Sequence, residues 1–181
     1  MFTLSNHILE QAEFIESPNF SERPEGITPS LLVIHNISLP PGQYGGSFVK
    51  EFFLNQLDTN IHPYFKEIKD LKVSSHLLVE RDGSVFQFVD FSKKAWHAGM
   101  SEFEGKQECN DFSVGIELEG TDTDPYSEKQ YEVLIDLTDC ILKNYHEITK
   151  DRIVGHSQIA PERKTDPGRS FDWSRYKYSL T

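Results

Sequence analysis

The sequence feature that most constrains the fold is an uninterrupted apolar run at 31–34, Leu-Leu-Val-Ile, which ends in His35 and Asn36. A strand that lacks polar alternation is typical of a sheet covered on both faces, because each face must then meet apolar partners. Side chains alternate along a strand, so Leu31, Val33 and His35 are expected to share one face. His35 would stand where the strand leaves the sheet, a usual place for ligand sites in open α/β sheets.

Alternating and turn-forming residues predict the rest of the sheet. The predicted strands lie at 10–14, 31–36, 75–80, 84–89, 112–120 and 152–155. Asp82 and Gly83 separate two of them, and Asp-Gly between apolar runs is a strong hairpin signal because it tolerates the positive φ of the turn. Along 112–120, Val114 is expected on an apolar face, with Gly115 and Glu117 on the other.

Apolar residues at helical spacing predict three helices. These helices lie at 47–57, 127–145 and 171–178, and the expected loops include 60–64 and 100–110. Ser127, with Gln130 three residues later, is the signature of a capping box at the start of a helix. The chain is therefore expected to have an α/β fold.

Length, charge and cysteine content limit the class of protein. The 181 residues fit a single domain, 1–181, on which the polar, proline-containing segment 1–29 is expected to pack as an extended arm. A net charge of −11 disfavours a nucleic-acid partner, because such proteins usually present a basic face. No segment has the composition of a signal peptide or the length of a membrane span, so no membrane partner is expected. Two unclustered cysteines, Cys109 and Cys140, favour a reduced, cytoplasmic protein.

The polar loop 155–168 contains the strongest candidates for a metal site. It holds His156, Lys164 and Asp166, and His35 is the best candidate for a third ligand. Two imidazoles, a carboxylate and a water are the pattern of a catalytic zinc site. The spacing alone is a weak motif, and the alternative is a loop in which Asp166 pairs with Arg163 or Lys164.

Glu117 is the candidate general base. Gly115, two residues earlier on the same predicted face, leaves room for another group to approach. A carboxylate close to a metal ion suits the deprotonation of water. The alternative is a solvated glutamate on a peripheral strand.

The histidines and the tryptophan between these segments can also be interpreted as purely structural residues. His76, on a predicted strand, is expected to be a structural histidine packed on the sheet. Trp96 and His97 are followed by the small residues Ala98 and Gly99. This segment either forms the wall of a substrate groove, with the indole stacked on a sugar and His97 hydrogen-bonded to it, or anchors a long loop.

Four segments, read together, resemble a known family: 33–36, 96–99, 115–120, and 155–156 with 164–168. The chain is similar to the AmpD family of cytoplasmic N-acetylmuramoyl-L-alanine amidases, and more distantly to phage-lysozyme-type amidases and peptidoglycan recognition proteins. The similarity runs from about Pro24 to Trp173. It implies a central mixed β-sheet flanked by helices, with a zinc site in a surface groove.

The resemblance also implies an activity and a role for individual residues. It implies that His35, His156 and Asp166 bind Zn²⁺. It further implies that Glu117 is the general base and that Lys164 stabilises the oxyanion. The expected substrate-binding residues are Asn36, Trp96, His97 and Lys72. The implied reaction is hydrolysis of the amide bond between the lactyl group of 1,6-anhydro-N-acetylmuramic acid and L-alanine, by a monomer acting on a small muropeptide during cell-wall recycling.

The chain departs from the family at the positions that bind the carboxylates of the stem peptide. The family has basic residues near positions 72 and 108. Here Lys72 keeps the positive charge but lacks the bidentate geometry of arginine, and Glu108 reverses the charge. Lys106 lies nearby in the sequence and could compensate for Glu108. Two alternatives therefore stand beside the recycling amidase. One is a muropeptide-binding module without activity, and the other is a phage-type or lytic amidase that acts on intact peptidoglycan.

Overall fold

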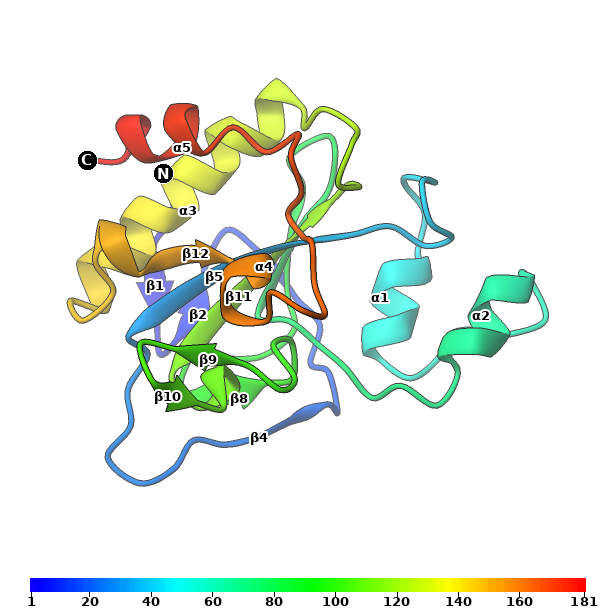
Figure 1. Ribbon diagram of the computed structural model, residues 1–181, viewed down its shortest axis with the longest axis horizontal. Helices are drawn as coiled ribbons and strands as arrows, with labels where there is room; N and C mark the ends of the chain where they lie inside the picture. Colours follow the sequence, from blue (N-terminus) through cyan, green and yellow to red (C-terminus); the bar gives the residue numbers. More distant parts are fainter.

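A six-stranded mixed sheet forms the centre of the computed structural model, which describes residues 1–181 (Figure 1). Its strands are β3 Glu13–Phe14, β5 Leu31–Ile37, β6 Leu77–Val79, β7 Val85–Gln87, β11 Ser113–Glu119 and β12 Ile153–Gly155. Their order across the sheet is β12-β5-β11-β6-β7-β3. β12, β5, β11 and β6 run parallel to one another, and β6 and β7 form the antiparallel hairpin predicted around Gly83.

Helices pack on both sides of this sheet. The helices are α1 Phe48–Phe53, α2 Pro63–Ile68, α3 Glu128–Asn144, α4 His156–Ile159 and α5 Trp173–Ser179, with 3₁₀ turns at Cys109–Asp111 and Lys150–Arg152. α3 and α5 lie together over one face, while α1 and α2 stand at another side of the molecule (Figure 1). The largest core cluster joins the sheet to α3 and α5 and includes Leu32, Ile34, Leu77, Val79, Val114, Ile116, Leu134, Leu137, Ile141 and Tyr176. None of the helices is long and apolar enough to cross a membrane.

The opposite face of the sheet carries the polar groups. Leu31 and Val33 pack there in a smaller cluster with Phe112, and α1 and α2 pack over another cluster that contains Phe53 and Phe65. The alternation predicted for 31–36 is therefore confirmed. Since the apolar face of β5 and β11 meets α3, the other side chains of these strands point away from that helix.

Three predictions outside the central sheet were wrong in part. The helix predicted at 47–57 ends at Phe53, and 60–64 is not a loop throughout, because α2 begins at Pro63. His62 caps α2 by accepting a hydrogen bond from the backbone of Tyr64, and proline at the first helical position needs no N–H partner. The predicted loop 100–110 contains a two-stranded hairpin, β9 Glu102–Phe103 with β10 Lys106–Gln107.

The segment 1–29 is held on the domain by short strands, of which β3 joins the central sheet, and by one buried cation. β1 Leu4–Ser5 pairs with β2 Ile8–Leu9, β3 pairs with β7, and β4 Phe20–Glu22 pairs with β8 Lys93–Ala95. The guanidinium of Arg23 donates to the carbonyl oxygens of Phe91, Asn110, Asp111 and Ser113. Burial lowers the pKa of Arg23 to about 10. These bonds tie the segment to the start of β11, one of the strands that carry the site.

The capping box predicted at Ser127 is present. The Ser127 hydroxyl accepts from the backbone of Gln130 and donates to the carbonyl of Arg81 in the hairpin turn. We expect Ser127→Ala to lower the free energy of unfolding by about 1–2 kcal/mol, because the cap and the bond to the turn are lost together. Urea unfolding measures this change. The exposed Ser5→Ala serves as the control and should change stability by less than about 0.5 kcal/mol; equal effects would contradict the role of the cap.

Candidate active site

Three segments far apart in the sequence bring His35, His156 and Asp166 together. His35 lies near the end of β5, and His156 directly follows β12, which pairs with β5 so that Gly155 is opposite Ile34. The loop that carries Asp166 returns onto this point, where its carbonyl accepts from the backbone of Ser157 at 3.0 Å. A Cβ at Gly155 would stand 2.7 Å from Pro167 Cδ, so glycine is what lets the loop approach.

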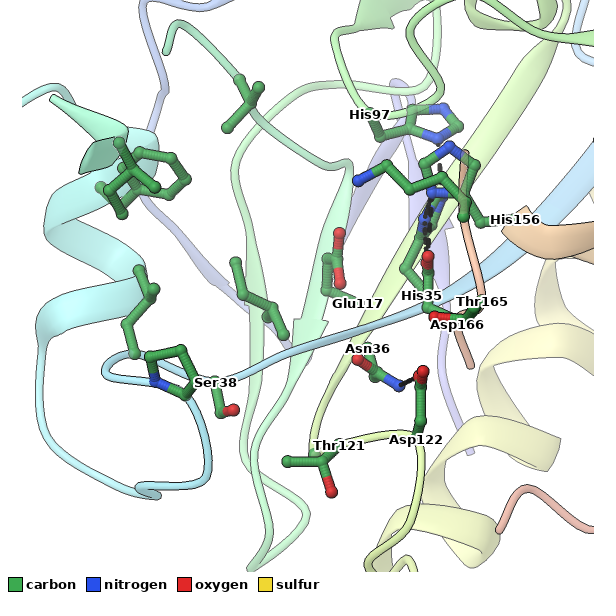
Figure 2. Close-up of a pocket in the computed structure, with 18 of the residues that line it drawn as sticks. His35, Asn36, Ser38, His97, Glu117, Thr121, Asp122, His156, Thr165 and Asp166 are labelled. Atoms are coloured by element: carbon green, nitrogen blue, oxygen red, sulfur yellow. Dashed lines mark hydrogen bonds and ion pairs between the residues drawn. The ribbon is translucent and has the colours of Figure 1, made fainter. Parts of the chain in front are cut away.

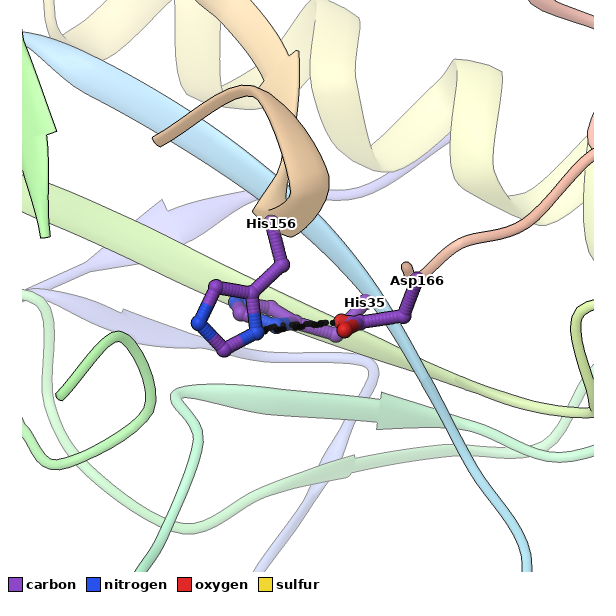
Figure 3. A group of neighbouring side chains, drawn as sticks. All are labelled: His35, His156 and Asp166. Carbon is purple, nitrogen blue, oxygen red and sulfur yellow. Dashed lines mark hydrogen bonds and ion pairs between the residues drawn. The ribbon is translucent and has the colours of Figure 1, made fainter. Parts of the chain in front are cut away.

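The facing atoms of the three residues form a small triangle (Figure 3). His35 Nδ1 lies 3.0 Å from His156 Nδ1 and 3.0 Å from Asp166 Oδ2, and His156 Nδ1 lies 3.2 Å from the same oxygen. Both histidines are almost fully buried. The alternative in which Asp166 pairs with a basic neighbour is wrong, because its ion-pair partners are these histidines and Arg163 donates to the carbonyls of Ala98 and Met100.

The surroundings favour a positive ion at the centre of this triangle. Burial lowers the pKa of His35 to about 4, which keeps the ring neutral. Burial alone would raise the pKa of Asp166, but its contacts with His156 and His35 outweigh burial and hold that pKa below the usual range. His156 Nε2 lies 3.0 Å from the carbonyl of Ala98 and must donate to it, so its Nδ1 carries a lone pair. Two imidazoles and a carboxylate are good ligands for a divalent transition metal.

Glu117 stands directly beside this triangle. It is opposite His35 in the parallel pairing of β11 with β5, and its side chain is only 9% exposed. Its Oε2 is buried without a hydrogen-bond partner, and Figure 2 shows the carboxylate directed into the pocket next to His35. Burial, and then the charge of Asp166, raise the pKa of Glu117 well above its ordinary value, with Lys164 opposing. β11 is central, so the alternative of a solvated glutamate on a peripheral strand is wrong.

A groove of about 670 Å³ runs over these residues. Its lining includes the triangle with Glu117, Lys164, Asn36, Trp96 and His97, and an apolar side formed by Leu39, Phe52, Phe53, Tyr64, Ile68 and Val73. Most of the apolar side comes from α1, α2 and the segments that flank them. The groove therefore combines a polar floor on the strands with an apolar wall on separate helices.

The expected substrate-binding residues lie in different surroundings. Asn36 lines the groove and donates to Asp122 Oδ1 at 2.9 Å (Figure 2). Trp96 lines the groove while its indole N–H bonds to Ser21. Lys72 is exposed and lies outside the groove lining, although the residues on both sides of it contribute to the lining.

His97 differs most from expectation. Its ring is 8% exposed, with Nδ1 2.9 Å from His35 Nε2 and Nε2 3.1 Å from Ser113 Oγ. Both ring nitrogens are thus engaged inside the protein. The room that Gly115 leaves is filled by this ring, since a Cβ there would stand 2.6 Å from it. His76 is structural as predicted: it is buried, and its ring nitrogens bond to the backbone of Gly115 and Lys93.

Sequence reasoning did not find Glu119 as a structural element of the groove. Its buried carboxylate accepts hydrogen bonds from the backbone of Gly45 and of Arg81. It thereby joins the loop after β5 to the turn of the β6–β7 hairpin. Alternation places Glu119 on the same side of the strand as Glu117. The two loops bond to the carboxylate of Glu119 and leave Glu117 Oε2 without a partner, and their positions could not be read from the sequence.

The sequence profile of the N-acetylmuramoyl-L-alanine amidases matches residues 25–169. The chain belongs to this amidase family. Its amidase relatives include the 1,6-anhydro-N-acetylmuramyl-L-alanine amidase AmpD of Haemophilus influenzae, 53% identical over 96% of this chain and 94% of the relative. The AmpD of Escherichia coli K12 is 50% identical over 92% of this chain and 90% of the relative. The match thus extends over the whole site and both ends of the sheet.

Solved structures of the amidase family agree with the fold. A crystal structure of a selenomethionine AmpD derivative superposes with a TM-score of 0.96 at 49% identity, covering 98% of this chain and 99% of that one. AmiD from E. coli, in complex with the substrate anhydro-N-acetylmuramic acid-L-Ala-D-gamma-Glu-L-Lys, gives a TM-score of 0.61 at 28% identity, covering 89% and 65%. The mixed sheet with flanking helices is therefore confirmed.

If the triangle binds a metal ion, removing its only negative charge should weaken that binding strongly. We expect Asp166→Asn to reduce the affinity for Zn²⁺ or Co²⁺ by more than about 100-fold, beyond the loss typical of residues that only support a ligand. Competition with a chromogenic chelator measures the affinity. Asp122→Asn is the control, because that carboxylate lines the same groove but bonds to Asn36; an Asp166→Asn variant with unchanged affinity would remove Asp166 from the ligand set.

Proposed function

We propose that this protein is a zinc-dependent amidase that cleaves the bond between the lactyl group of 1,6-anhydro-N-acetylmuramic acid and L-alanine of the stem peptide. The observation that carries the proposal is the free, buried carboxylate of Glu117 beside three converging ligand atoms in an open groove. Membership of the amidase family and the names of the AmpD relatives support the same reaction. The site is thereby assigned a substrate, a metal and a reaction.

The ligand set fits zinc. Ligands about 2.0–2.2 Å from a tetrahedral zinc ion lie roughly 3.3 Å or slightly more from one another. The triangle of His35, His156 and Asp166 has sides of 3.0, 3.0 and 3.2 Å, which is close to that spacing. Three protein ligands would leave a fourth position for water or substrate, as catalytic sites require. When bound there, zinc lowers the pKa of water and polarises a carbonyl oxygen.

Glu117 is suited to move the proton in this reaction. Amide hydrolysis adds water to the carbonyl carbon and breaks the carbon–nitrogen bond, so one proton must pass from the water to the leaving amine of L-alanine. The unpartnered Oε2 of Glu117 is available to accept that proton and to deliver it. Its raised pKa makes it a stronger base than an ordinary glutamate.

Lys164 and the groove complete the proposed mechanism. Lys164 lines the groove, and its positive charge acts on both Glu117 and His35. We assign to it the stabilisation of the negative charge that develops on the amide oxygen. Asn36 would bind the substrate by hydrogen bonds and Trp96 by stacking on the sugar. Lys72 would act at the outer rim on a carboxylate of the stem peptide, without the bidentate geometry of arginine.

The proposal extends to the setting of the reaction. We place it in the recycling of released cell-wall fragments, with a cytoplasmic monomer that acts on small muropeptides. A polymeric substrate would be the mark of a lytic amidase, and binding without cleavage the mark of a recognition module.

Zinc content and product release test this function directly. We expect about one zinc per chain and release of the L-alanine-containing peptide from 1,6-anhydromuropeptide, with release abolished by a chelator and restored by Zn²⁺. Metal analysis and chromatography of the products measure both. Faster release from intact peptidoglycan would replace the recycling function with a lytic one, and muropeptide binding with neither zinc nor release would make the protein a recognition module.

Glu117→Gln separates the general base from the metal site. Glutamine keeps the size of the side chain but cannot take up a proton, so we expect turnover to fall by roughly 100- to 10,000-fold while zinc content stays unchanged. Steady-state kinetics on 1,6-anhydromuropeptide and metal analysis of the same preparation measure the two effects. Turnover at the rate of the unaltered enzyme would remove Glu117 from the mechanism.

A further inference from the structure

A single short segment, 96–99, lies behind both histidines of the triangle. The ring of His97 reaches His35, with 2.9 Å between His97 Nδ1 and His35 Nε2. The next residue reaches His156, with 3.0 Å between the carbonyl of Ala98 and His156 Nε2. Each imidazole is therefore engaged at Nε2 by this segment and directs Nδ1 to Asp166.

The segment itself is held in place by groups outside the triangle. Asn110 Oδ1 accepts hydrogen bonds from the backbone N–H groups of His97, at 3.1 Å, and of Ala98, at 2.8 Å. Ser113 Oγ lies 3.1 Å from His97 Nε2, and the ring packs on the bare backbone of Gly115. The ring of His97 thus has a defined position and two defined hydrogen-bond partners.

We propose that the segment 96–99 is a clamp that presents the Nδ1 atoms of both histidines to the metal, with His97 acting as a positioning residue for His35. The inference rests on the proposed metal site but concerns residues that do not bind the metal. It gives His97 a function behind the ligands, where the sequence had suggested a contact with the substrate.

The bonds of His97 to His35 and Ser113 allow two donor–acceptor arrangements, and only one of them leaves Nδ1 of His35 without a proton. In that arrangement His35 Nε2–H donates to His97 Nδ1, and His97 Nε2–H donates to Ser113 Oγ. In the other arrangement His97 Nδ1–H donates to His35, whose Nδ1 then carries the proton and cannot bind a metal ion. Because the bond at one ring nitrogen decides what the other can bind, His97 must act as the acceptor when His35 is a ligand.

The clamp offers the two histidines different hydrogen-bond partners. The carbonyl of Ala98 can only accept, so His156 has its proton at Nε2 whether or not a metal is bound. A backbone carbonyl is an ordinary partner of a metal-binding histidine, whereas a second imidazole has two tautomers. The orientation of His35 is therefore the one that depends on a replaceable side chain.

Three substitutions of His97 distinguish a hydrogen-bond acceptor from a packing group. In asparagine the side-chain oxygen falls near the position of Nδ1, in glutamine the polar atoms fall near Nε2, and phenylalanine fills the space without an acceptor. We expect His97→Phe and His97→Gln to weaken Zn²⁺ binding by about 10- to 100-fold, the usual effect of losing such a partner, and His97→Asn to stay within about threefold of the unaltered protein. Competition with a chelator measures the affinity without any substrate.

Nitrogen-15 NMR of the histidine rings supplies a readout that packing would not change. In the zinc-loaded protein we expect His97 to carry its proton at Nε2 alone, with Nδ1 as an acceptor. Mixed tautomers of His97, or equal loss of affinity in all three variants, would overturn the inference and leave His97 a packing residue. Thermal unfolding of each variant identifies any that fail to fold, and His97→Asn then decides the outcome by its rescue.

Substitutions of Asn110 test the same inference independently of His97. Asn110→Asp keeps the oxygen that accepts the two backbone N–H groups, whereas Asn110→Ala removes it. We expect the alanine variant to lose zinc affinity by several-fold and the aspartate variant to keep it; the reverse order would contradict the clamp. Because affinity and tautomers are measured without muropeptide, failure of the clamp is distinguishable from failure of the proposed amidase reaction.

Discussion

The site depends on the parallel pairing of β5 with its two neighbours. The pairing with β11 sets Glu117 opposite His35, and the pairing with β12 sets Gly155 opposite Ile34, so that the next residue, His156, meets His35. Side chains alternate along strands, so a slip of one residue would turn His35 toward α3 and bury the imidazole in an apolar core. The apolar residues Leu32 and Ile34, packed beneath α3, oppose such a slip. The hydrophobic core therefore determines the register, and the register determines the chemistry.

Strand alternation allowed part of this site to be predicted, while its assembly could not be. The faces of His35 and Glu117 follow from the alternation of side chains along a strand, since β11 has apolar residues at every second position and His35 ends a continuous apolar run. The meeting of His35 with Asp166, 131 positions away, is a tertiary contact; residue chemistry made His35 a candidate, but the spacing alone was a weak motif and the resemblance to a family strengthened it. The hairpin at Gly83 is predictable because its turn residues are local signals, whereas the hairpin 102–107 lacks apolar alternation, so its sequence predicts a loop.

His97 shows where sequence reasoning fails in physical terms. Beside Trp96 in a loop, a histidine followed by two small residues suggests an open surface. The space that mattered was at Gly115 on β11, where the missing side chain lets the ring of His97 lie against the backbone. A glycine in a central strand usually weakens it, so its presence there is itself a sign of close approach by another group. The partner that approaches can be identified only in three dimensions.

Chemistry and recognition are thus carried by different parts of the fold. His35, Glu117 and His156 stand on β5, on β11 and directly after β12, which are elements with buried backbones, and precise sites require such support. Asp166 and Lys164 come from the loop between α4 and α5. The apolar wall of the groove comes from α1 and α2, which contact their own core cluster and not the one beneath α3. Substitutions in that wall can alter which muropeptide is accepted without moving His35 or Glu117. Glu108 lies outside these strands, directly before the 3₁₀ turn Cys109–Asp111, so a substitution there leaves the strands that carry His35 and Glu117 in place.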